Sequence, residues 1–234
     1  DAYYKCMERA IKNSFATAIS SEGYKKFLPN HDYIPVHNID TVNIEASIKK
    51  RSTITNEASL PIRISFIGLV RYYEENKKLI KVLGNDTRFL IQYFGQNSDV
   101  LKNYCEKNNI TNVNFAGRFK PSETAGFYSK TDIINNIYGN SDLAVTTALS
   151  NKLYFAAALN IPILVSPNTY MEEITKQYGF GYSVNLENSS LADELYNWYE
   201  YFRNSDKNQS KLLWDKAIED NNKFEKKFME FINC

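Results

Sequence analysis

The residues with the clearest chemical potential lie at the start of one apolar stretch, at Ser150-Asn151-Lys152. Ser150 suits a helix N-cap, because its hydroxyl can accept a hydrogen bond from an unpaired amide of the first turn. Such a terminus attracts anions through its free amides and the positive end of the helix dipole. A lysine in the first turn adds a full positive charge, so the pattern predicts a phosphate-binding site. A solvated surface lysine is the alternative interpretation.

The elements that would position this site follow directly in the chain. Residues 153–159 are apolar nearly all round, which predicts a buried helix. Asn160 favours the end of that helix, and residues 161–165 have the apolar character of a core strand. The site is therefore expected where a loop enters a buried helix that leads into a central strand.

A regular alternation of strands and helices begins at Pro61. Short apolar strands separated by helices are typical of a parallel sheet that is covered on both faces. We therefore predict an α/β fold, with a Rossmann-like parallel sheet of about six strands, helices on both faces, and two further C-terminal helices. The expected strands are 62–67, 87–94, 112–116, 132–137, 161–165 and 181–184, and the expected helices are 74–83, 98–108, 121–130, 150–159, 170–178, 190–203 and 207–232.

The leading part of the chain has a different pattern. We expect a helix over 4–13, a strand over 15–20, a helix over 21–28 and an extended piece over 33–38. Residues 39–60 are polar and show little periodic apolar pattern, which predicts an irregular linker. Because the chain opens on Asp1 in what reads as a helix already under way, we expect it to be part of a longer protein.

Composition narrows the classes of function. Lys and Arg total 28 against 27 Asp and Glu, a net charge of +1, which does not fit a nucleic-acid-binding protein. No apolar run approaches the roughly 20 residues that a membrane helix needs. The cysteines Cys6, Cys105 and Cys234 lie far apart, with neither metal-ligand spacing nor a disulfide framework. A reducing compartment is therefore favoured over secretion.

Ligands of open α/β sheets bind outside the carboxyl ends of the strands, so the loops after the predicted strands are the candidate sites. Arg71 and Lys77 flank the first of these loops, and Lys152 begins the helix after another. Cations that converge at strand ends suit a diphosphate, with arginine as the bidentate partner. Gly68, directly after the first strand, permits close approach of its backbone amide to a phosphate; a plain strand–helix turn is the alternative.

Several common sites are excluded. No G-x-G-x-x-G follows a strand, so a nicotinamide or flavin fingerprint is missing, and no G-x-x-x-x-G-K-[ST] occurs, which excludes a P-loop. The two histidines, His31 and His37, lie in the leading segment and offer no convincing catalytic triad. We interpret His37 as a structural or interdomain residue.

Several motifs together resemble the C-terminal, donor-binding domain of GT-B glycosyltransferases, especially those of bacterial capsular polysaccharide synthesis. In order, they are Ile64-Ser65-Phe66-Ile67-Gly68, Leu90-Ile91-Gln92-Tyr93-Phe94-Gly95, Val113-Asn114-Phe115-Ala116-Gly117, and Ser150-Asn151-Lys152-Leu153-Tyr154 running into Asn160-Ile161-Pro162-Ile163-Leu164. Residues 19–25 and 36–38 similarly resemble the end of the N-terminal domain and the crossing into the second.

The resemblance implies three parts: residues 1–40 as the end of an N-terminal acceptor domain, 41–60 as a linker, and 61–234 as the donor-binding domain with its C-terminal helices. It implies a nucleotide-diphosphate sugar as donor, no metal, and a glycan or lipid-linked acceptor. It also implies a cytoplasmic protein with peripheral association at the inner membrane face. Since the acceptor side belongs to the N-terminal domain, no catalytic residue is assigned, and the isolated chain is expected to bind nucleotide weakly and to turn over nothing.

The candidate site residues fall into two groups. The expected phosphate-binding group is Gly68, Arg71, Lys77, Asn151 and Lys152. The other group, drawn from strand-end loops, would contact the nucleoside or the sugar; its members are Tyr138, Asn140, Ser150, Tyr170, Glu172 and Glu173. Glu172 alternatively completes a capping box with Thr169. Plain packing is the alternative for Tyr138 and Tyr170.

One departure from the family pattern leaves two other functions open. Many retaining members carry a spaced pair of glutamates, the second of which binds the donor ribose, but the matching positions here are Thr147 and Phe155. A nucleotide-sugar 2-epimerase on the same fold is one alternative, although its chemistry requires a histidine near the sugar and the strand-end loops contain none. A non-catalytic interaction module is the other. The base, the sugar, the acceptor, the stereochemical outcome and the oligomeric state are not assigned.

Overall fold

The fold is centred on one parallel sheet, seen in a computed structural model that describes residues 2–52, 60–205 and 209–233. The sheet has six strands in the order β5-β4-β3-β6-β7-β8, all parallel. The winding reverses between β3 and β6, which is where doubly wound sheets bind ligands. The predicted α/β fold is confirmed. The strands are β3 (Ile62–Ile67), β4 (Phe89–Phe94), β5 (Val113–Gly117), β6 (Ile133–Asn136), β7 (Ile163–Val165) and β8 (Gly181–Ser183).

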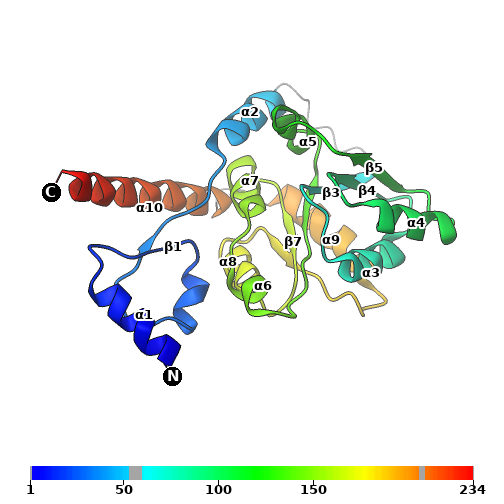
Figure 1. The fold of residues 1–234 in the computed structure, drawn as a ribbon. Helices are drawn as coiled ribbons and strands as arrows, with labels where there is room; N and C mark the ends of the chain where they lie inside the picture. The colour runs from blue at the N-terminus through cyan, green and yellow to red at the C-terminus, as the bar shows by residue number, and fades with distance from the viewer. Residues whose placement is uncertain (1, 53–59, 206–208, 234) are drawn as a thin grey trace.

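Helices cover both faces of this sheet (Figure 1). On one face α3 (Tyr73–Leu83) and α4 (Asp99–Lys107) pack over β3, β4 and β5, with the first turns of α9 (Leu191–Asn204). The other face is covered by helices that contribute to a second buried cluster around α7. These helices are α2 (Thr41–Arg51), α5 (Thr124–Tyr128), α7 (Asn151–Leu159), α8 (Tyr170–Gln177) and α10 (Gln209–Ile232). Burial of apolar surface on both faces supplies the main driving force for this arrangement.

The segment expected to be an irregular linker is helical over much of its length, so that part of the prediction is wrong. Residues 41–51 form α2, and the Asp40 carboxylate caps it by accepting the amide of Asn43 at 3.1 Å. Ile44 and Ser47 are fully buried where α2 packs on α5 and α7. This apolar stripe is short and interrupted by polar residues, so periodicity did not reveal it. Residues 53–59 lie outside the described part of the chain.

The buried helix of the candidate site has the predicted start and end. The Ser150 hydroxyl accepts the amide of Lys152 at 3.2 Å, and Asn160 ends α7 in the left-handed conformation with φ of 51°. Two neighbouring helices differ from expectation. The stretch 121–130 divides into the 3₁₀ helix η2 (Pro121–Glu123) and α5, and an unpredicted helix, α6 (Leu143–Thr147), precedes α7. The Asp142 side chain caps α6 by accepting the amide of Val145 at 2.9 Å.

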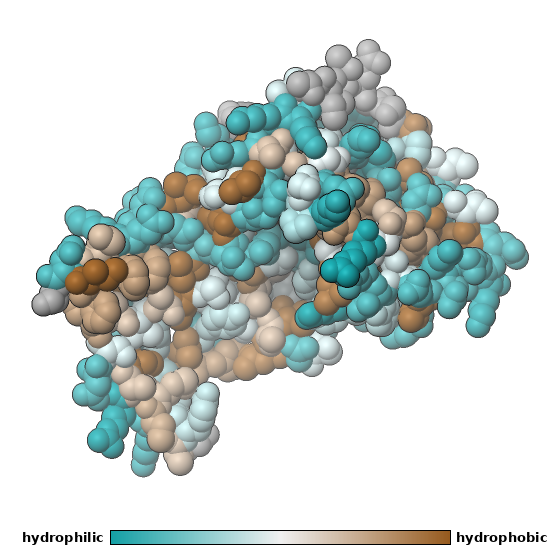
Figure 2. Space-filling model, turned by 45° about the horizontal axis from the view of Figure 1, so that its top comes forward, coloured by the Kyte–Doolittle hydropathy of each residue, from teal (hydrophilic) through white to brown (hydrophobic). Residues whose placement is uncertain are grey.

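The N-terminal segment forms a small unit of its own beside the main sheet. After α1 (Ala2–Lys12), the strands β1 (Ala18–Ile19) and β2 (Ile34–Pro35) pair in parallel, joined by the 3₁₀ helix η1 (Glu22–Lys26). The strand expected over 15–20 and the helix over 21–28 are thus both shorter than predicted. The far end of α10 extends over this unit, and apolar side chains gather there (Figure 2).

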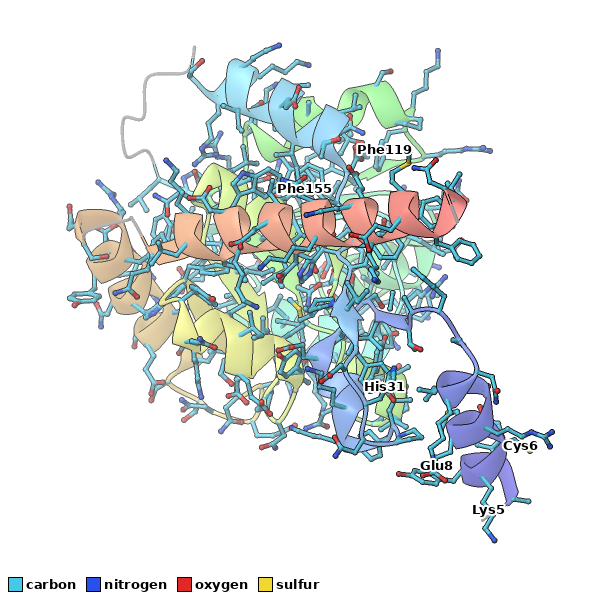
Figure 3. The ribbon with its side chains drawn as sticks, turned by 90° about the vertical axis from the view of Figure 1, so that its left-hand side faces the viewer. Lys5, Cys6, Glu8, His31, Phe119 and Phe155 are labelled. Carbon is cyan, nitrogen blue, oxygen red and sulfur yellow. The ribbon has the colours of Figure 1, made fainter. Side chains whose placement is uncertain are left out.

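Helix α10 runs from α7 past β2 to the C-terminus (Figure 1), whereas α1 stands apart from the sheet and carries Lys5, Cys6 and Glu8 (Figure 3). In the described residues, no helix combines the length and the apolar character needed to span a bilayer.

Residues 36–51, which lead from β2 through α2, are called the crossing segment below. A buried group of hydrogen-bonded side chains joins this segment to the main body. The Nδ1 atom of His37 lies 2.7 Å from the Tyr154 hydroxyl on α7, and its Nε2 atom lies 3.2 Å from the Asp220 carboxylate on α10. The backbone of His37 also exchanges two hydrogen bonds with the Asn221 side chain. Residue 37 therefore joins three elements, which agrees with its interpretation as a structural residue.

Burial lowers the pKa of His37 below its ordinary value, although the carboxylate of Asp220 opposes that shift. As the pH falls below about 6.5, the unfolded chain therefore binds a proton before the folded chain does. The stabilising contribution is complete above that pH and is lost as the pH falls toward the lowered pKa. We expect the free energy of urea unfolding to fall between pH 7 and pH 5, and to fall less in His37→Gln.

His31→Gln is the matched control, because His31 is the other histidine and its side chain is exposed. Its pH dependence should equal that of the wild type. A His37→Gln variant with the wild-type slope would contradict the account.

Two glycines at strand ends differ in what surrounds them. A Cβ atom on Gly95 would overlap the carbonyl oxygen of Gly68, whereas one on Gly117 would meet open space. Both have positive φ, +148° and +70°. Gly117→Ala should therefore lower the free energy of unfolding by only about 1 kcal/mol, the cost of the left-handed backbone for alanine. Gly95→Ala should lower the free energy of unfolding by about 2 kcal/mol or more, because the backbone at Gly68 must also move. Equal losses in urea unfolding would contradict the close approach of β3 and β4.

Candidate functional site

The candidate site is built around a buried lysine at the start of α7. Lys152 is 6% exposed, and its Nζ atom donates to the Tyr138 hydroxyl at 2.6 Å. The same atom lies 3.9 Å from the centroid of the Phe66 ring, which gives a cation–π contact at the end of β3. In the described part of the chain Lys152 forms no ion pair with a carboxylate. A buried ammonium with donors to spare is a binding group for an anion.

The phenol that holds Lys152 is itself electrostatically tuned. Burial raises the pKa of Tyr138, whereas the charge of Lys152 and its hydrogen bond lower it. Ser150 and Arg71 lower it further, and the net pKa lies below the ordinary value for tyrosine. The polar groups around Tyr138 therefore create a local positive potential at the reversal point of the sheet.

A strained residue closes one side of the site. Tyr72 precedes α3 in the left-handed conformation, with φ of 56° and ψ of 52°. Its ring stacks on Tyr138, with centroids 4.8 Å apart and planes at 28°. Bulky residues adopt this conformation at an energetic cost, and such strain gathers at functional sites. The stacked pair stands between β3 and β6 and fixes the orientation of the Tyr138 phenol.

Three adjoining cavities follow the carboxyl ends of the strands, and we call them together the cleft. The outer cavity, about 340 Å³, lies at the ends of β4 and β5, where it is lined by Gly95 and Arg118. The central cavity, about 420 Å³, contains Lys152 and Arg71. The inner cavity, about 190 Å³, lies over the ends of β6 and β7. Residues shared by neighbouring cavities make the cleft continuous; they are Gly68, Leu69 and Phe119 for the first two, and Tyr72, Tyr138 and Ser150 for the last two.

Aromatic rings line the central cavity, and one of them, Phe119, lines the outer cavity as well. Phe155 and Tyr128 stack in parallel, with centroids 3.9 Å apart and planes at 6°. Phe119 packs edge-on to Phe127 nearby, at 4.9 Å. In the view of Figure 3, Phe119 and Phe155 lie between α10 and α2. The position that would carry a glutamate by resemblance thus belongs to an aromatic wall, and flat apolar surfaces of this kind suit a stacked ring.

Six of the predicted residues come together in the cleft. Arg71 and Asn151 are exposed at the central cavity, beside buried Lys152. Gly68, Tyr138 and Ser150 line it as well.

The other predicted residues line none of these three cavities. Lys77 pairs with Glu74 at 2.7 Å, and the Asn140 side chain donates to the carbonyl of Pro167. The Glu172 carboxylate accepts the amide of Asn168, the residue before the N-cap Thr169, and pairs with Lys176. Two residues face the N-terminal unit instead: Tyr170 packs over Gly23, and Glu173 pairs with Lys26 at 3.0 Å.

Sequence reasoning missed several residues that line the cleft. Arg118 and Phe119 follow a glycine at the end of β5, the same signal that singled out Gly68. Tyr72 carries no local signal, since its role depends on a partner that is distant in the sequence. Phe155 was noted only as the position that the resemblance gives to a ribose-binding glutamate. Among the described residues, no cluster of three or more histidine, cysteine, aspartate or glutamate side chains is arranged to hold a metal ion.

No protein-family model and no curated protein sequence matches this chain. Solved structures do match its fold. The Anabaena protein Alr3699/HepE, solved in complex with UDP, aligns with a TM-score of 0.66 and 10% identity over 96% of this chain and 66% of that one. Sucrose-phosphate synthase from Thermosynechococcus elongatus aligns with a TM-score of 0.64 and 12% identity, covering 98% of this chain and 63% of the other.

A third similar structure is AviGT4, a glycosyltransferase of avilamycin A biosynthesis, with a TM-score of 0.60 and 13% identity over 91% of this chain and 62% of AviGT4. This chain therefore spans 62–66% of the length of these three proteins. At such low identity the likeness establishes the fold. The chain has the fold of one Rossmann-like domain of the GT-B glycosyltransferases, as the motif order led us to expect.

A buried ammonium without a carboxylate partner costs stability unless a ligand neutralises it. We expect Lys152→Met to leave the free energy of urea unfolding unchanged or to raise it by about 1 kcal/mol. Lys77→Met, which removes a surface pair on α3, is the matched control and should lose no more than about 0.5 kcal/mol. A loss of more than about 2 kcal/mol in Lys152→Met would show that the ammonium is a structural requirement instead.

Proposed function

We propose that this chain is the donor-binding part of a GT-B glycosyltransferase that uses a nucleotide-diphosphate sugar. The observation that carries the proposal is the buried Lys152 at the N-terminus of α7, which has no carboxylate partner among the described residues and lies in a cleft at the reversal point of the sheet. Lys152, Arg71 and the first amides of α7 offer converging donors, and a diphosphate presents the matching set of acceptors. The Anabaena protein of similar fold was solved with UDP-glucose, which supports a nucleotide sugar as the ligand class.

The cavities give such a donor an orientation. The aromatic wall of Phe119, Tyr128 and Phe155 adjoins the outer cavity at Phe119, whose ring would contact the nucleobase or ribose. The diphosphate would then lie at Lys152, and the sugar would point into the inner cavity. As the sugar is transferred, negative charge grows on the leaving diphosphate. Fixed cations and amides stabilise that charge, so we propose that no metal is required.

We propose that residues 1–40 belong to a second α/β domain, the acceptor domain, with residues 61–234 forming the donor domain. Two-stranded parallel sheets such as β1–β2 are normally parts of larger, covered sheets. An apolar groove of about 340 Å³ lies beside these strands, lined by Phe15, Phe224, Phe228 and Phe231. We propose that further residues of the acceptor domain cover this groove. The crossing segment between the parts includes α2 and so is partly helical.

The acceptor in this proposal is a glycan or a lipid-linked glycan of a surface polysaccharide such as a capsule, and the enzyme works in the cytoplasm at the inner membrane face. The 2-epimerase alternative is disfavoured, because neither histidine lines the cleft and His37 is engaged by Tyr154 and Asp220. No base for the acceptor hydroxyl is assigned in this chain. We therefore expect no transfer or hydrolysis by the chain alone, and turnover in a coupled nucleotide-release assay would contradict that expectation.

Calorimetric titration with UDP, GDP and their sugars tests the donor proposal. We expect saturable binding of one nucleotide, weakened at least about tenfold by Arg71→Ala and by Lys152→Ala, since hydrogen bonds to charged groups contribute about 1.5–3 kcal/mol. Lys77→Ala is the matched control, because Lys77 pairs with Glu74 outside the cleft, and its affinity should equal that of the wild type. Absence of binding, or equal losses in all three variants, would contradict the proposal.

A further inference from the structure

One buried amide in the cleft lacks the partner that its neighbours have. Asn136 is the last residue of β6 and is 3% exposed, yet its Oδ1 atom has no hydrogen-bond partner among the described residues. The adjacent Asn135 is fully engaged, donating to Asn76 at 3.0 Å and accepting the amide of Ile137 at 3.0 Å. Because buried polar atoms are almost always paired, an unpaired acceptor on a residue that lines a cavity points to a ligand donor.

The inner cavity that Asn136 lines is mostly apolar. Its polar residues include Ser166, whose Oγ atom accepts the amides of Tyr138 at 3.1 Å and Gly139 at 2.8 Å. A hydroxyl that accepts two hydrogen bonds still has its own proton to donate. Among the described residues, the cavity thus combines the amide of Asn136, the hydroxyl of Ser166 and an apolar wall. The wall is formed by Ala144, Val145, Ala148, Leu149 and Met171.

An acetamido group has the same three features in one unit. Its N–H is a donor, its carbonyl is an acceptor, and its methyl group is apolar. A hydroxyl group presents both donor and acceptor sites in little volume, so it would leave the apolar wall without a matching surface. The chemistry of the cavity therefore favours an N-acetylated sugar over a plain hexose.

The position of the cavity relative to Lys152 fits a sugar joined to the diphosphate. The central and inner cavities share Tyr72, Tyr138 and Ser150, so a group bonded to a phosphate at Lys152 can reach into the inner cavity. The stacked tyrosines line the junction of the two cavities, and Tyr72 holds its place there with a left-handed backbone.

We infer that the inner cavity selects the donor sugar as an N-acetylhexosamine, with its amide N–H on Asn136 Oδ1, its carbonyl toward the Ser166 hydroxyl and its methyl group against Val145 and Met171. Asn136 is then a specificity-determining residue. The inference rests on the proposed function, because it takes the diphosphate of a nucleotide sugar to lie at Lys152.

Calorimetric titration of the chain with UDP, UDP-glucose and UDP-N-acetylglucosamine tests the inference. We expect UDP-N-acetylglucosamine to bind at least about tenfold more tightly than UDP-glucose, as in sites built to pair a substrate N–H. Asn136→Leu keeps the approximate volume and should abolish that preference while the affinity for UDP stays unchanged. Asn140→Leu is the matched control, since Asn140 is exposed and lies outside the lining, and it should keep the preference.

Val145→Phe provides a second variant should Asn136→Leu fold poorly. It fills the cavity, so it should weaken binding of UDP-N-acetylglucosamine and spare UDP. Equal affinities for the two sugars in the wild type, or a preference that survives both variants, would overturn the inference while UDP binding upheld the donor site. A chain that binds GDP alone would overturn the inference and leave the donor site upheld. A chain that binds no nucleotide would overturn both the inference and the proposed donor site.

Discussion

The contact on which the site depends is that of the Lys152 ammonium with the Tyr138 phenol and the Phe66 ring. It holds a positive charge in the interior, where water screens it poorly and where a bound anion would feel it strongly. Each partner comes from a different element: Phe66 from the end of β3, Tyr138 from the loop after β6, and Lys152 from the first turn of α7. The charge is therefore fixed at the reversal point of the sheet only when these elements are assembled.

The same helix connects the site to the rest of the molecule. Tyr154, two residues after Lys152, forms a hydrogen bond with His37 of the crossing segment, and His37 in turn contacts Asp220 of α10. Any displacement of the crossing segment would therefore act on the helix that carries the ammonium. In the proposed enzyme this arrangement would place the acceptor side and the donor side in a defined relation. The orientation of α7 is thus determined near its N-terminal end by both the cleft and the crossing segment.

Local signals in the sequence revealed much of the fold and part of the site. Alternating apolar segments gave the parallel sheet, and the serine, lysine and asparagine around one apolar run gave α7 and its anion-binding terminus. Helix α2 was missed because its buried stripe is short, and it is stabilised by contact with α5 and α7. The role of Tyr72 and the unpaired amide of Asn136 depend on partners supplied by the assembled strands. No local pattern could have shown them. By the same reasoning, Glu172 and Tyr170 fit the strand-end rule, yet in the structure Glu172 contacts Asn168 and Lys176, and Tyr170 packs over Gly23.

The most direct test of the central claim is a crystal structure of this chain grown with UDP. The account predicts the diphosphate in the central cavity, with phosphate oxygens within hydrogen-bonding distance of Lys152 Nζ and of the first amides of α7, and with the Arg71 side chain turned toward it. A nucleotide bound elsewhere, such as in the apolar groove beside α10, would contradict the account. So would a diphosphate in the cleft that Lys152 does not contact.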